Sequence, residues 1–392
     1  MMLDGRVSPY KIPLCAPYKR ATPCVRIAIF CYGSLPPVYA RRQRVSPQSL
    51  IRTTGEPAPS GTDPQVPCRI SVIVPTRNRH VLLERTLAGI LAQAFDAFEV
   101  IVIDDASDAT TRAAYAAIWQ GLDARFRLVQ LGATGGSGSG PSQARNAGIE
   151  LARGDILTFC DDDDFWTCAG HLSAMAEVFD AGLAVDLYIA DQVAVTHDGT
   201  RERAHWLPAL AALVGGRSRD HARGYLLPID DLVRAGGFAQ LNILAVSKAT
   251  TAAIGGFWTR TSYEEDRDFF WRAADAARAL FFNPDIVAQH NVPDASRQNN
   301  LSRSFSQAER WLLSVLVSQH IAMTVRSSAI RTMCQAYEGD ILRRLSQYWS
   351  GQGRHALGLQ YARRALAARV SFKWAMYTAG LATRQVLRGR QA

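Results

Sequence analysis

The 392-residue sequence has no run of about 18 uncharged apolar residues, so we expect no membrane-spanning helix. Its seven cysteines are odd in number and lack the paired spacing of a zinc module or a disulfide framework. A reducing compartment fits this cysteine usage best, which predicts a cytoplasmic protein. Hydrophobic residues (48%) and charged residues (20%) occur in ordinary globular proportions, which excludes a wholly disordered, collagenous or coiled-coil chain.

Acidic residues are absent from residues 351–392, which hold eight Lys and Arg. Residues 1–66 hold nine Lys and Arg against three acids, so the two ends account for more than the whole excess of nine positive charges. The segment between them is mildly acidic. A basic total ordinarily suggests nucleic-acid binding, but here the positive charge lies outside the expected folded core. We therefore expect no nucleic-acid partner.

The length allows two or three folded units, and the composition divides the chain into three segments. Residues 1–66 are rich in Pro, Arg and Ser without a regular period, which indicates a basic, disordered arm. A signal peptide within 26–40 and a translated stretch upstream of the true start are alternative interpretations of this segment. Residues 67–304 alternate strand-like and helix-like patterns, and residues 305–392 have a helical pattern with a basic end.

Four short apolar runs, each followed by a helical pattern, occur within 100 residues. Such cycles predict an α/β fold with a doubly wound, mostly parallel sheet. The four runs lie at 69–74, 98–103, 126–131 and 155–160. Further strands are expected at 187–195 and 242–246, and Ser142 is expected to cap the helix after the third run.

Acidic residues gather at the ends of these expected strands, where sheets of this kind bind their ligands. Asp161–Asp164 directly follows the fourth run, and clustered carboxylates on a short turn suit a hard divalent cation. An acidic loop that caps the next helix is the alternative. Asp104 and Asp105 follow the second run, where an acid either contacts a nucleoside or caps a turn.

A second acidic cluster, Glu264–Asp266, precedes several large apolar residues. A carboxylate at the edge of a dry pocket gains basicity, which suits a general base; a solvated helix N-terminus is the alternative. His290 follows a strand-like run and is either a ligand or, as is commoner for a lone histidine, structural. The glycine-rich segment 135–140 lacks the Lys-Ser/Thr of a Walker motif, so we expect a flexible loop beside the site.

Taken in order, these motifs resemble those of the family 2 inverting glycosyltransferases, which have the GT-A nucleotide-sugar fold. The matching segments are SVIVPTRNR at 71–79, VIVIDDAS at 100–107, ARNAGIELARGDILTFCDDDDFW at 144–166, GGF at 255–257, EEDRDFFWR at 264–272 and the later His290. No single segment is decisive, but six in this order are highly specific. The resemblance implies a metal-dependent enzyme that moves a sugar from a nucleotide-diphospho-sugar, typically a UDP-sugar, to an acceptor hydroxyl.

The resemblance also implies roles for individual residues. At the nucleotide sugar it places Pro75, Thr76, Arg77, Asp105 and Asp162. Arg145, near the start of the third helix, is expected to reach the same ligand, with a solvated capping residue as the alternative. At a Mn²⁺ or Mg²⁺ ion it places Asp161, Asp163 and His290, and it makes Asp266 the catalytic base. Four consecutive acids depart from the commoner Asp-Ser-Asp-Asp, which leaves open which carboxylates bind the metal. The unusual loop at 132–140 likewise leaves the nucleotide open.

The implied partners are a nucleotide-diphospho-sugar donor and a glycan or lipid-linked acceptor, in polysaccharide, cell-wall or glycolipid synthesis. Residues 351–392 contain a basic, aromatic-bearing helix at 370–387, which either lies on an anionic membrane surface or packs on the catalytic domain. The first alternative would place the protein on the inner face of the plasma membrane. A catalytically silent nucleotide-sugar or glycan-binding protein of the same fold is the competing functional interpretation, although a binder has no need of a base such as Asp266.

Overall fold

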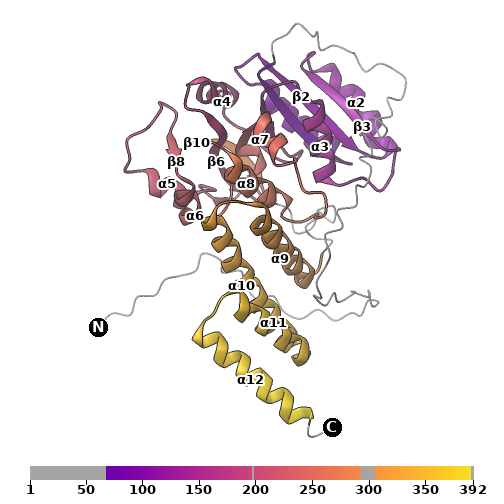
Figure 1. The fold of residues 1–392 in the computed structure, drawn as a ribbon. Coiled ribbons are helices and arrows are strands. Elements are labelled where there is room, and N and C mark those ends of the chain that lie inside the picture. The colour runs from indigo at the N-terminus through magenta and orange to yellow at the C-terminus, as the bar shows by residue number, and fades with distance from the viewer. Residues whose placement is uncertain (1–67, 197, 293–304, 390–392) are drawn as a thin grey trace. The chain divides into compact units, whose positions relative to one another are not determined.

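The computed structural model describes residues 68–196, 198–292 and 305–389, and the expected arm at 1–66 lies outside these ranges. Within them, ten strands form one sheet in the order β3-β2-β1-β4-β9-β6-β10-β5, with β7 beside β6 and β8 beside β10 (Figure 1). The strands are β1 (Ile70–Thr76), β2 (Phe98–Asp105), β3 (Phe126–Leu131), β4 (Ile156–Phe159), β5 (Phe165–Trp166), β6 (Val185–Val195), β7 (Arg201–Arg203), β8 (Tyr225–Leu227), β9 (Leu244–Ser247) and β10 (Ala279–Asn291).

The helices of the sheet domain lie between these strands. They are α1 (His80–Leu91), α2 (Ala109–Gln120), α3 (Pro141–Leu151), α4 (His171–Asp180), α5 (Pro208–Val214), α6 (Ile229–Ala235), α7 (Lys248–Ala253) and α8 (Glu265–Ala276). The helix α3 packs on β1 and β2, whereas α4 packs on β6. Alternating strands and helices around one sheet are the α/β architecture that the sequence predicts.

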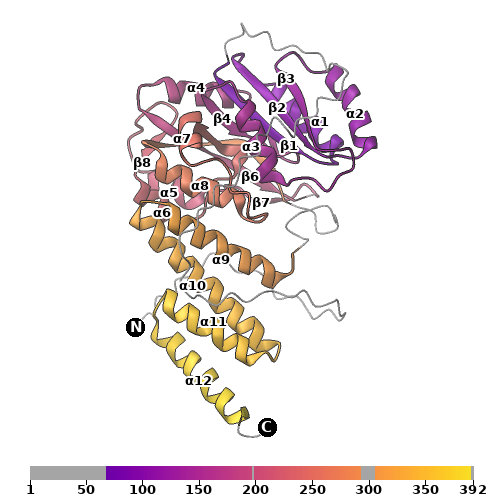
Figure 2. The same cartoon turned by 45° about the vertical axis from the view of Figure 1, so that its right-hand side comes forward.

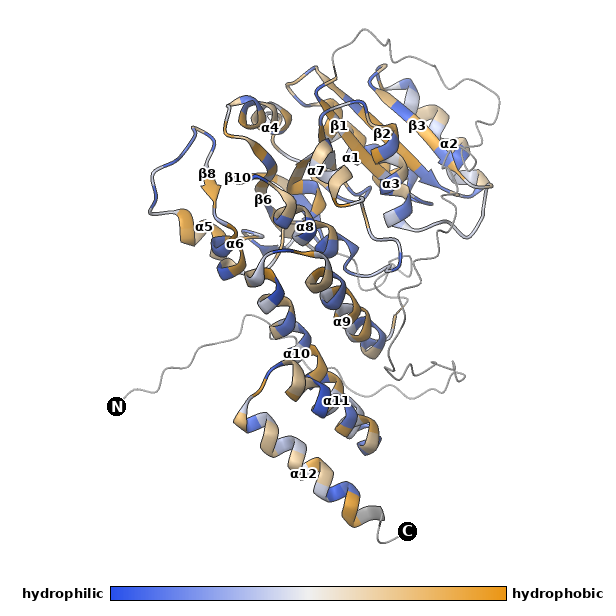
Figure 3. Ribbon diagram, viewed as in Figure 1, coloured by the Kyte–Doolittle hydropathy of each residue, from blue (hydrophilic) through white to orange (hydrophobic). Residues whose placement is uncertain are grey.

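The strands β3, β2, β1 and β4 are mutually parallel, which confirms the predicted doubly wound sheet. Every residue of β1 and β2 is buried, as their continuous apolar runs require, and Figure 3 colours both strands largely as hydrophobic. The chain moves from β1 outward to β2 and β3 and then returns to β4 on the other side of β1. This reversal lies between β1 and β4, where ligands bind at the carboxyl ends of the strands.

The other half of the sheet is mixed. β9 runs antiparallel to both β4 and β6, whereas β6 and β10 are parallel. The strand expected at 187–195 is confirmed as β6, but the one expected at 242–246 begins as a 3-10 turn (Leu241–Ile243) before β9. β5 pairs antiparallel with β10, which brings the end of β10 next to the acidic turn.

The helix α3 differs from the sequence prediction at its first turn. It begins at Pro141, and Gly140 takes the N-cap position with a φ of 92° and no side chain to cap the helix. Proline favours the first helical position because its φ is already helical. Ser142 therefore lies inside the helix, buried and with its hydroxyl unpartnered among the described residues, so its prediction as the cap is wrong.

The C-terminal region is helical, as predicted, and each helix packs on the next (Figure 2). Its helices are α9 (Gln307–Thr324), α10 (Ser328–Gly351), α11 (His355–Ala368) and α12 (Phe372–Gly389). Val317 and Ile321 of α9 and Ile330 of α10 belong to the apolar core of the sheet domain. Ala308 and Val315 of α9 and the later part of α10 form a second core with α11 and α12. None of the helices in the described ranges is long and apolar enough to cross a bilayer.

Candidate active site

Asp161–Asp164 form the turn between β4 and β5, at the reversal point of the sheet. The side chains of Asp162 and Asp164 are only 6% and 3% exposed, whereas those of Asp161 and Asp163 are 39% and 28% exposed. Thr86 Oγ1 lies 3.0 and 2.7 Å from the backbone carbonyl oxygens of Asp162 and Asp164, which fixes the turn. The carboxylates of Asp162 and Asp164 are therefore buried, whereas those of Asp161 and Asp163 remain partly accessible to solvent.

The buried Asp162 connects β1 to the acidic turn. Its carboxylate accepts hydrogen bonds from Thr76 Oγ1 at 2.8 Å and from Arg79 Nη1 at 3.0 Å. The same Arg79 nitrogen lies 2.9 Å from Asp163 Oδ2. No role was predicted for Arg79. The only feature of the sequence that could have indicated one is its place as a second basic residue, after Arg77, in the segment that follows β1.

The buried Asp164 holds the end of β10 in place. His290 Nδ1 lies 3.0 Å from its carboxylate, and the backbone N–H of Asn291 donates to it at 2.8 Å. Asn291 Nδ2 also donates to the carbonyl oxygen of Asp163. His290 is thus close to the acidic turn, as predicted, but its ring nitrogen contacts the carboxylate of Asp164 and not those of Asp161 or Asp163.

Crowding of these carboxylates changes how readily they ionise. Burial, followed by the charges of Asp164 and Asp162, raises the pKa of Asp163 to about 7. Burial also raises the pKa of Asp164, although His290 opposes the shift. For His290 itself, burial disfavours the charged form, but the carboxylates of Asp164, Asp163 and Asp161 together outweigh burial and raise its pKa. Added positive charge at this turn would therefore be favourable.

Arg77 and Asp105, both predicted at the nucleoside, hold the glycine-rich loop between β3 and α3. Asp105 accepts backbone hydrogen bonds from Ser139 at 2.7 Å and Gly140 at 2.8 Å. Arg77 donates to the carbonyl oxygen of Gly136 at 2.7 Å. The expected flexible loop is therefore tied at both sides to strand-end residues. Pro75 and Thr76 are buried at the end of β1 beside it.

Arg145 of α3 joins the acidic turn to the second acidic cluster. Its Nη2 lies 2.6 Å from Asp161 Oδ1, and its Nη1 lies 3.2 Å from Glu265 Oε1. Burial disfavours its charged form, but Asp161 and Glu265 outweigh burial and raise its pKa. The residue predicted as a nucleotide ligand is therefore a buried cation that bridges two carboxylates, one in each cluster.

Asp266 lies in the first turn of α8, next to the carboxylate held by Arg145. Its side chain accepts the backbone N–H of Arg267 at 2.8 Å. Burial and then the charge of Glu265 raise the pKa of Asp266 to about 7, against the opposing charge of Arg145. A carboxylate whose pKa lies near neutral pH is suited to general-base catalysis.

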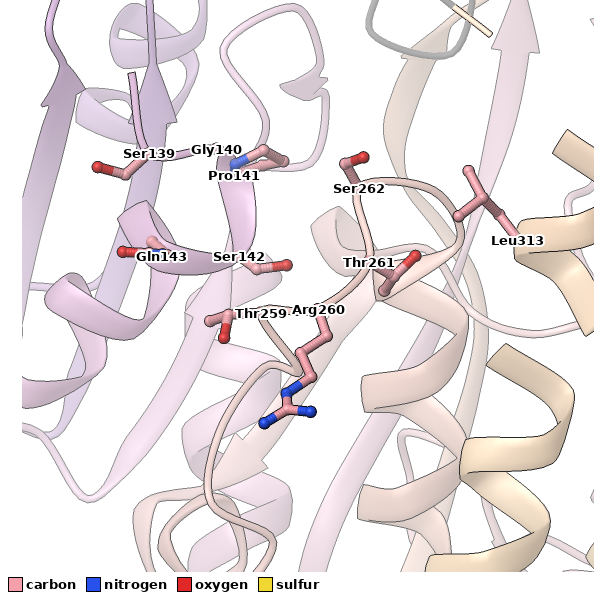
Figure 4. A pocket seen from close by; sticks show the side chains of 10 residues that line it. All are labelled: Ser139, Gly140, Pro141, Ser142, Gln143, Thr259, Arg260, Thr261, Ser262 and Leu313. Atoms are coloured by element: carbon pink, nitrogen blue, oxygen red, sulfur yellow. The ribbon is translucent and has the colours of Figure 1, made fainter. Parts of the chain in front are cut away.

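A cavity of about 190 Å³ lies between the first turn of α3 and the segment that leads to Asp266 (Figure 4). It is lined by Ser139, Gly140, Pro141, Ser142, Gln143, Thr259, Arg260, Thr261, Ser262 and Leu313. One wall is the loop held by Asp105, and the other includes Thr261, which donates to the carbonyl oxygen of Tyr263 at 2.7 Å. The cavity thus lies between the loop held by Asp105 and residues 259–262, which precede the predicted base Asp266 in the chain.

Asp161 and Asp163 fit a divalent cation best among the residues predicted to bind metal. Both carboxylates are accessible at the strand end and offer the hard oxygen ligands that Mg²⁺ and Mn²⁺ prefer. Their present partners are the guanidinium groups of Arg145 and Arg79. In the described part of the chain, no three His, Cys, Asp or Glu side chains already stand together as a metal cluster.

Comparison with known proteins identifies the family that this chain resembles. Residues 71–241 match the family model described as glycosyl transferase family 2. The chain carries a glycosyltransferase family 2 domain. The family predicted from the sequence is thereby confirmed, although Glu265, Asp266 and His290 lie beyond the matched segment.

Curated relatives match a limited part of the chain. A GalNAc(5)-diNAcBac-PP-undecaprenol β-1,3-glucosyltransferase of Campylobacter jejuni is 35% identical over 116 residues. This alignment covers 30% of the present chain and 36% of the relative. The chain therefore matches only about a third of that protein's length.

Two solved structures share the fold over most of both chains. S. aureus TarS in complex with UDP-GlcNAc is 16% identical, with a TM-score of 0.50 over 76% of this chain and 81% of that chain. The mannosyltransferase PcManGT of Pyrobaculum calidifontis, in complex with GDP-Man and Mn²⁺, is 21% identical, with a TM-score of 0.50 over 85% and 84%. These likenesses confirm the predicted GT-A type of fold.

Proposed function

We propose that this protein is an inverting glycosyltransferase that moves a sugar from a nucleotide-diphospho-sugar, with a UDP-sugar favoured, to an acceptor hydroxyl. The observation that carries the proposal is the bridge from Asp161 through Arg145 to Glu265, which places the acidic turn and Asp266 in one charged network. The acidic turn supplies the donor end of this network. Asp266, with its raised pKa, supplies the base.

In the proposed reaction, Asp266 takes the proton from the acceptor hydroxyl. The acceptor oxygen forms a bond to the anomeric carbon, and the bond from that carbon to the donor phosphate breaks on the opposite face. The nucleoside diphosphate leaves with the electron pair of the broken bond. A single displacement of this kind inverts the configuration at the anomeric carbon, and general-base help contributes about 10²–10⁴ in rate.

Asp161 and Asp163 would hold a Mn²⁺ or Mg²⁺ ion, because their carboxylates are accessible at the strand end. Such an ion, when bound, offsets negative charge on the leaving diphosphate. Asp162 and Asp164 would keep the turn in shape through Thr76 and His290. Asp105 and Arg77 would bound the nucleoside site through the loop that they hold.

The donor site is tested by thermal unfolding of the full chain with UDP, GDP, CDP and dTDP, each with Mn²⁺ and with EDTA. Ligand that binds only the native state raises the unfolding temperature. We expect one nucleotide to give a manganese-dependent shift that Asp163→Asn abolishes. We expect Asp266→Asn to keep this shift but to lose about 10²–10⁴ in transfer rate. Loss of the shift in a folded Asp266→Asn protein would contradict its role as base, and no shift with any nucleotide would contradict the function.

The acceptor that we propose is a lipid-linked glycan. The Campylobacter jejuni relative is named for an acceptor on undecaprenyl diphosphate, which supports this class without identifying the sugar. Such an acceptor is confined to a membrane, so an enzyme that uses it needs access to the membrane surface. The helix α12 offers chemistry suited to that surface.

The helix α12 has two apolar faces. On one face Trp374 and Leu381 are buried against the neighbouring helix, and Trp374 Nε1 donates to the carbonyl oxygen of Ala362 at 3.0 Å. On the other face four large apolar side chains are each more than half exposed. They are Phe372, Met376, Val386 and Leu387. The segment was predicted either to pack on the catalytic domain or to lie on a membrane. One face packs on α11 instead, and the exposed apolar face supports the second alternative as a proposal.

We propose that the exposed face of α12 binds an anionic membrane. Residues 351–392 hold eight Lys and Arg and no acid, so their charge is complementary to acidic lipid headgroups. Each basic residue near such a surface adds about 1 kcal/mol to binding. Amphipathic helices with this combination lie in the plane of the interface.

Flotation with vesicles of phosphatidylcholine and phosphatidylglycerol tests the membrane proposal. We expect the full chain to float, and we expect a variant with serine at the four exposed α12 positions to remain in solution. A matched control carries Val81→Ser and Met323→Ser, which remove apolar side chains that are 67% and 78% exposed elsewhere. Equal flotation of all three proteins would contradict the proposal. It would also be contradicted by a wild-type protein that is a dimer in solution beside an α12 variant that is a monomer, because the exposed face would then bind a second copy of the chain.

A further inference from the structure

Glu264, the residue directly before α8, has an unusual backbone conformation. Its φ of 56° and ψ of 29° lie in the left-handed region, which side chains larger than those of Gly, Asn and Asp seldom adopt. Such strain persists only where the surrounding structure holds it, and it is commonest at functional sites. Two residues later the chain reaches Asp266.

Two hydroxyl groups from the C-terminal helices hold this residue. Glu264 Oε1 accepts hydrogen bonds from Ser314 Oγ of α9 and from the phenol of Tyr337 of α10, each at 3.0 Å. The Arg267 guanidinium stacks over the Tyr337 ring at 3.6 Å and lies 3.8 Å from Glu264 Oε2. Burial, followed by the Glu264 charge, raises the pKa of Tyr337 to about 12, so the phenol keeps its proton and donates.

We propose that Glu264 positions the base Asp266 and that Ser314 and Tyr337 in turn hold Glu264. Because these two residues belong to α9 and α10, both helices contribute to the geometry of the active centre. The inference rests on the proposed function of Asp266. It is based on the sequence positions of three consecutive residues. Ser314 holds Glu264, the next residue Glu265 contacts Arg145, and Asp266 follows in the same turn, so the position of Glu264 determines that of Asp266. Ser314 and Tyr337 lie outside the family match at 71–241.

A second contact between α8 and the C-terminal helices provides a matched control. Asp275, in the last turn of α8, accepts the backbone N–H groups of Arg326 at 2.8 Å and Ser327 at 2.7 Å. It joins the same helix to the same region, but lies roughly 14 Å along the helix axis from Asp266. A purely structural role for Glu264 predicts similar effects from loss of either contact.

The charged and titratable groups around Asp266 make the pH dependence of the transfer rate informative. They are Glu264, Glu265, Arg145, the following Arg267 and the nearby phenol of Tyr263. Loss of the negative charge of Glu264 favours ionised Asp266, because like charges disfavour ionisation. The acid limb of the rate profile should then move to lower pH. Loss of a merely structural contact would leave that limb in place.

The experiment compares variants of the full chain by the release of UDP from UDP-GlcNAc and of GDP from GDP-mannose. Glu264→Gly allows the left-handed backbone but removes the carboxylate, and we expect kcat to fall about 10- to 100-fold with donor KM within about twofold. Tyr337→Phe combined with Ser314→Ala should act in the same direction. Glu264→Gln keeps an oxygen for both hydroxyls, so it should recover most of kcat while it moves the acid limb down. Asp275→Asn should lower the unfolding temperature and leave kcat and the acid limb unchanged.

The proposal is overturned if Glu264→Gly keeps kcat within about twofold of wild type, or if Asp275→Asn loses as much kcat at an equal loss of thermal stability. If the wild type releases neither nucleotide, the proposed function fails for these donors, and amide hydrogen exchange at residues 262–268 decides the positioning claim. Faster exchange there in Glu264→Gly than in both wild type and Asp275→Asn supports it. Equal exchange in all three overturns it.

Discussion

Asp266 shares its turn with Glu264 and Glu265, so two further negative charges surround the proposed base. Burial and these charges raise its pKa to about 7, and only the deprotonated form can accept a proton from the acceptor. We therefore expect kcat to be constant above about pH 8 and to fall roughly tenfold per pH unit below about pH 6. The measurement is kcat from pH 5 to 9 at saturating donor and metal.

Donor binding serves as the control for this pH profile. Asp163 also has a pKa raised to about 7, so weaker metal binding at low pH would produce a similar fall at low metal concentration. A fall caused by Asp163 should disappear as the metal concentration rises, whereas one caused by Asp266 should not. A kcat that stays level from pH 5 to 9 would contradict the assignment of Asp266.

For individual residues, the sequence indicates which acids belong to the candidate site but not which residues they contact. The acidic turn and Asp266 could be located because one follows a buried strand and the other precedes a helix. The bridge from Arg145 to Glu265 joins positions 120 residues apart, and the contact from Tyr337 to Glu264 joins positions 73 apart. Such pairs depend on tertiary packing, and no local pattern in one sequence encodes them.

Among the secondary-structure elements, β1 has a strict packing requirement, because the turn before β4 approaches its backbone closely. A Cβ atom at Gly154 would lie 2.8 Å from both the Ile70 carbonyl carbon and the Ser71 nitrogen. These atoms belong to a fully buried strand and cannot move aside. We expect Gly154→Ala to destabilise the protein by about 1–3 kcal/mol, as measured by urea unfolding.

Gly121 provides the matched control for this substitution. It ends α2 with a φ of −92°, and a Cβ atom there would lie 3.7 Å from the Ile118 carbonyl oxygen, an ordinary contact distance. Alanine at such a compatible site stabilises a protein by about 0.4–1 kcal/mol, because it restricts the unfolded chain. Equal effects of the two substitutions would show that the approach of Gly154 to β1 carries no cost.

The elements themselves follow closely from hydrophobic pattern. The sequences of β1 and β2 are largely apolar at consecutive positions, and such runs are typical of strands that are buried on both faces of a sheet. The errors occur where backbone geometry outweighs side-chain chemistry, as at Gly140 and Pro141, which start α3 without a capping serine. The antiparallel pairing of β9 is also invisible in sequence, because an apolar run does not indicate strand direction.

In the whole molecule, α9 and α10 each contribute side chains to both apolar cores, and this division could not be located from the sequence. Val317 and Ile321 of α9 and Ile330 of α10 complete the core of the sheet domain. Leu345 of α10 and Leu359 of α11 belong to the second core. A helical pattern shows that a face is apolar but not which neighbour covers it. The apolar core of the sheet domain therefore extends beyond residue 304, into α10.

Two shortened chains test this extension. A chain that ends at residue 351 keeps α9 and α10, so it should retain the nucleotide-dependent thermal shift at a lowered stability, because Leu345 loses its cover from α11. A chain that ends at residue 304 uncovers the sheet domain where Val317 and Ile321 pack, and it also frees Glu264 from Ser314. We expect this shorter chain to be insoluble, or to bind a hydrophobic dye without a cooperative thermal transition. A soluble, cooperatively folding 1–304 chain with the full nucleotide shift would mean that the catalytic body ends before α9, and that the C-terminal helices serve another purpose.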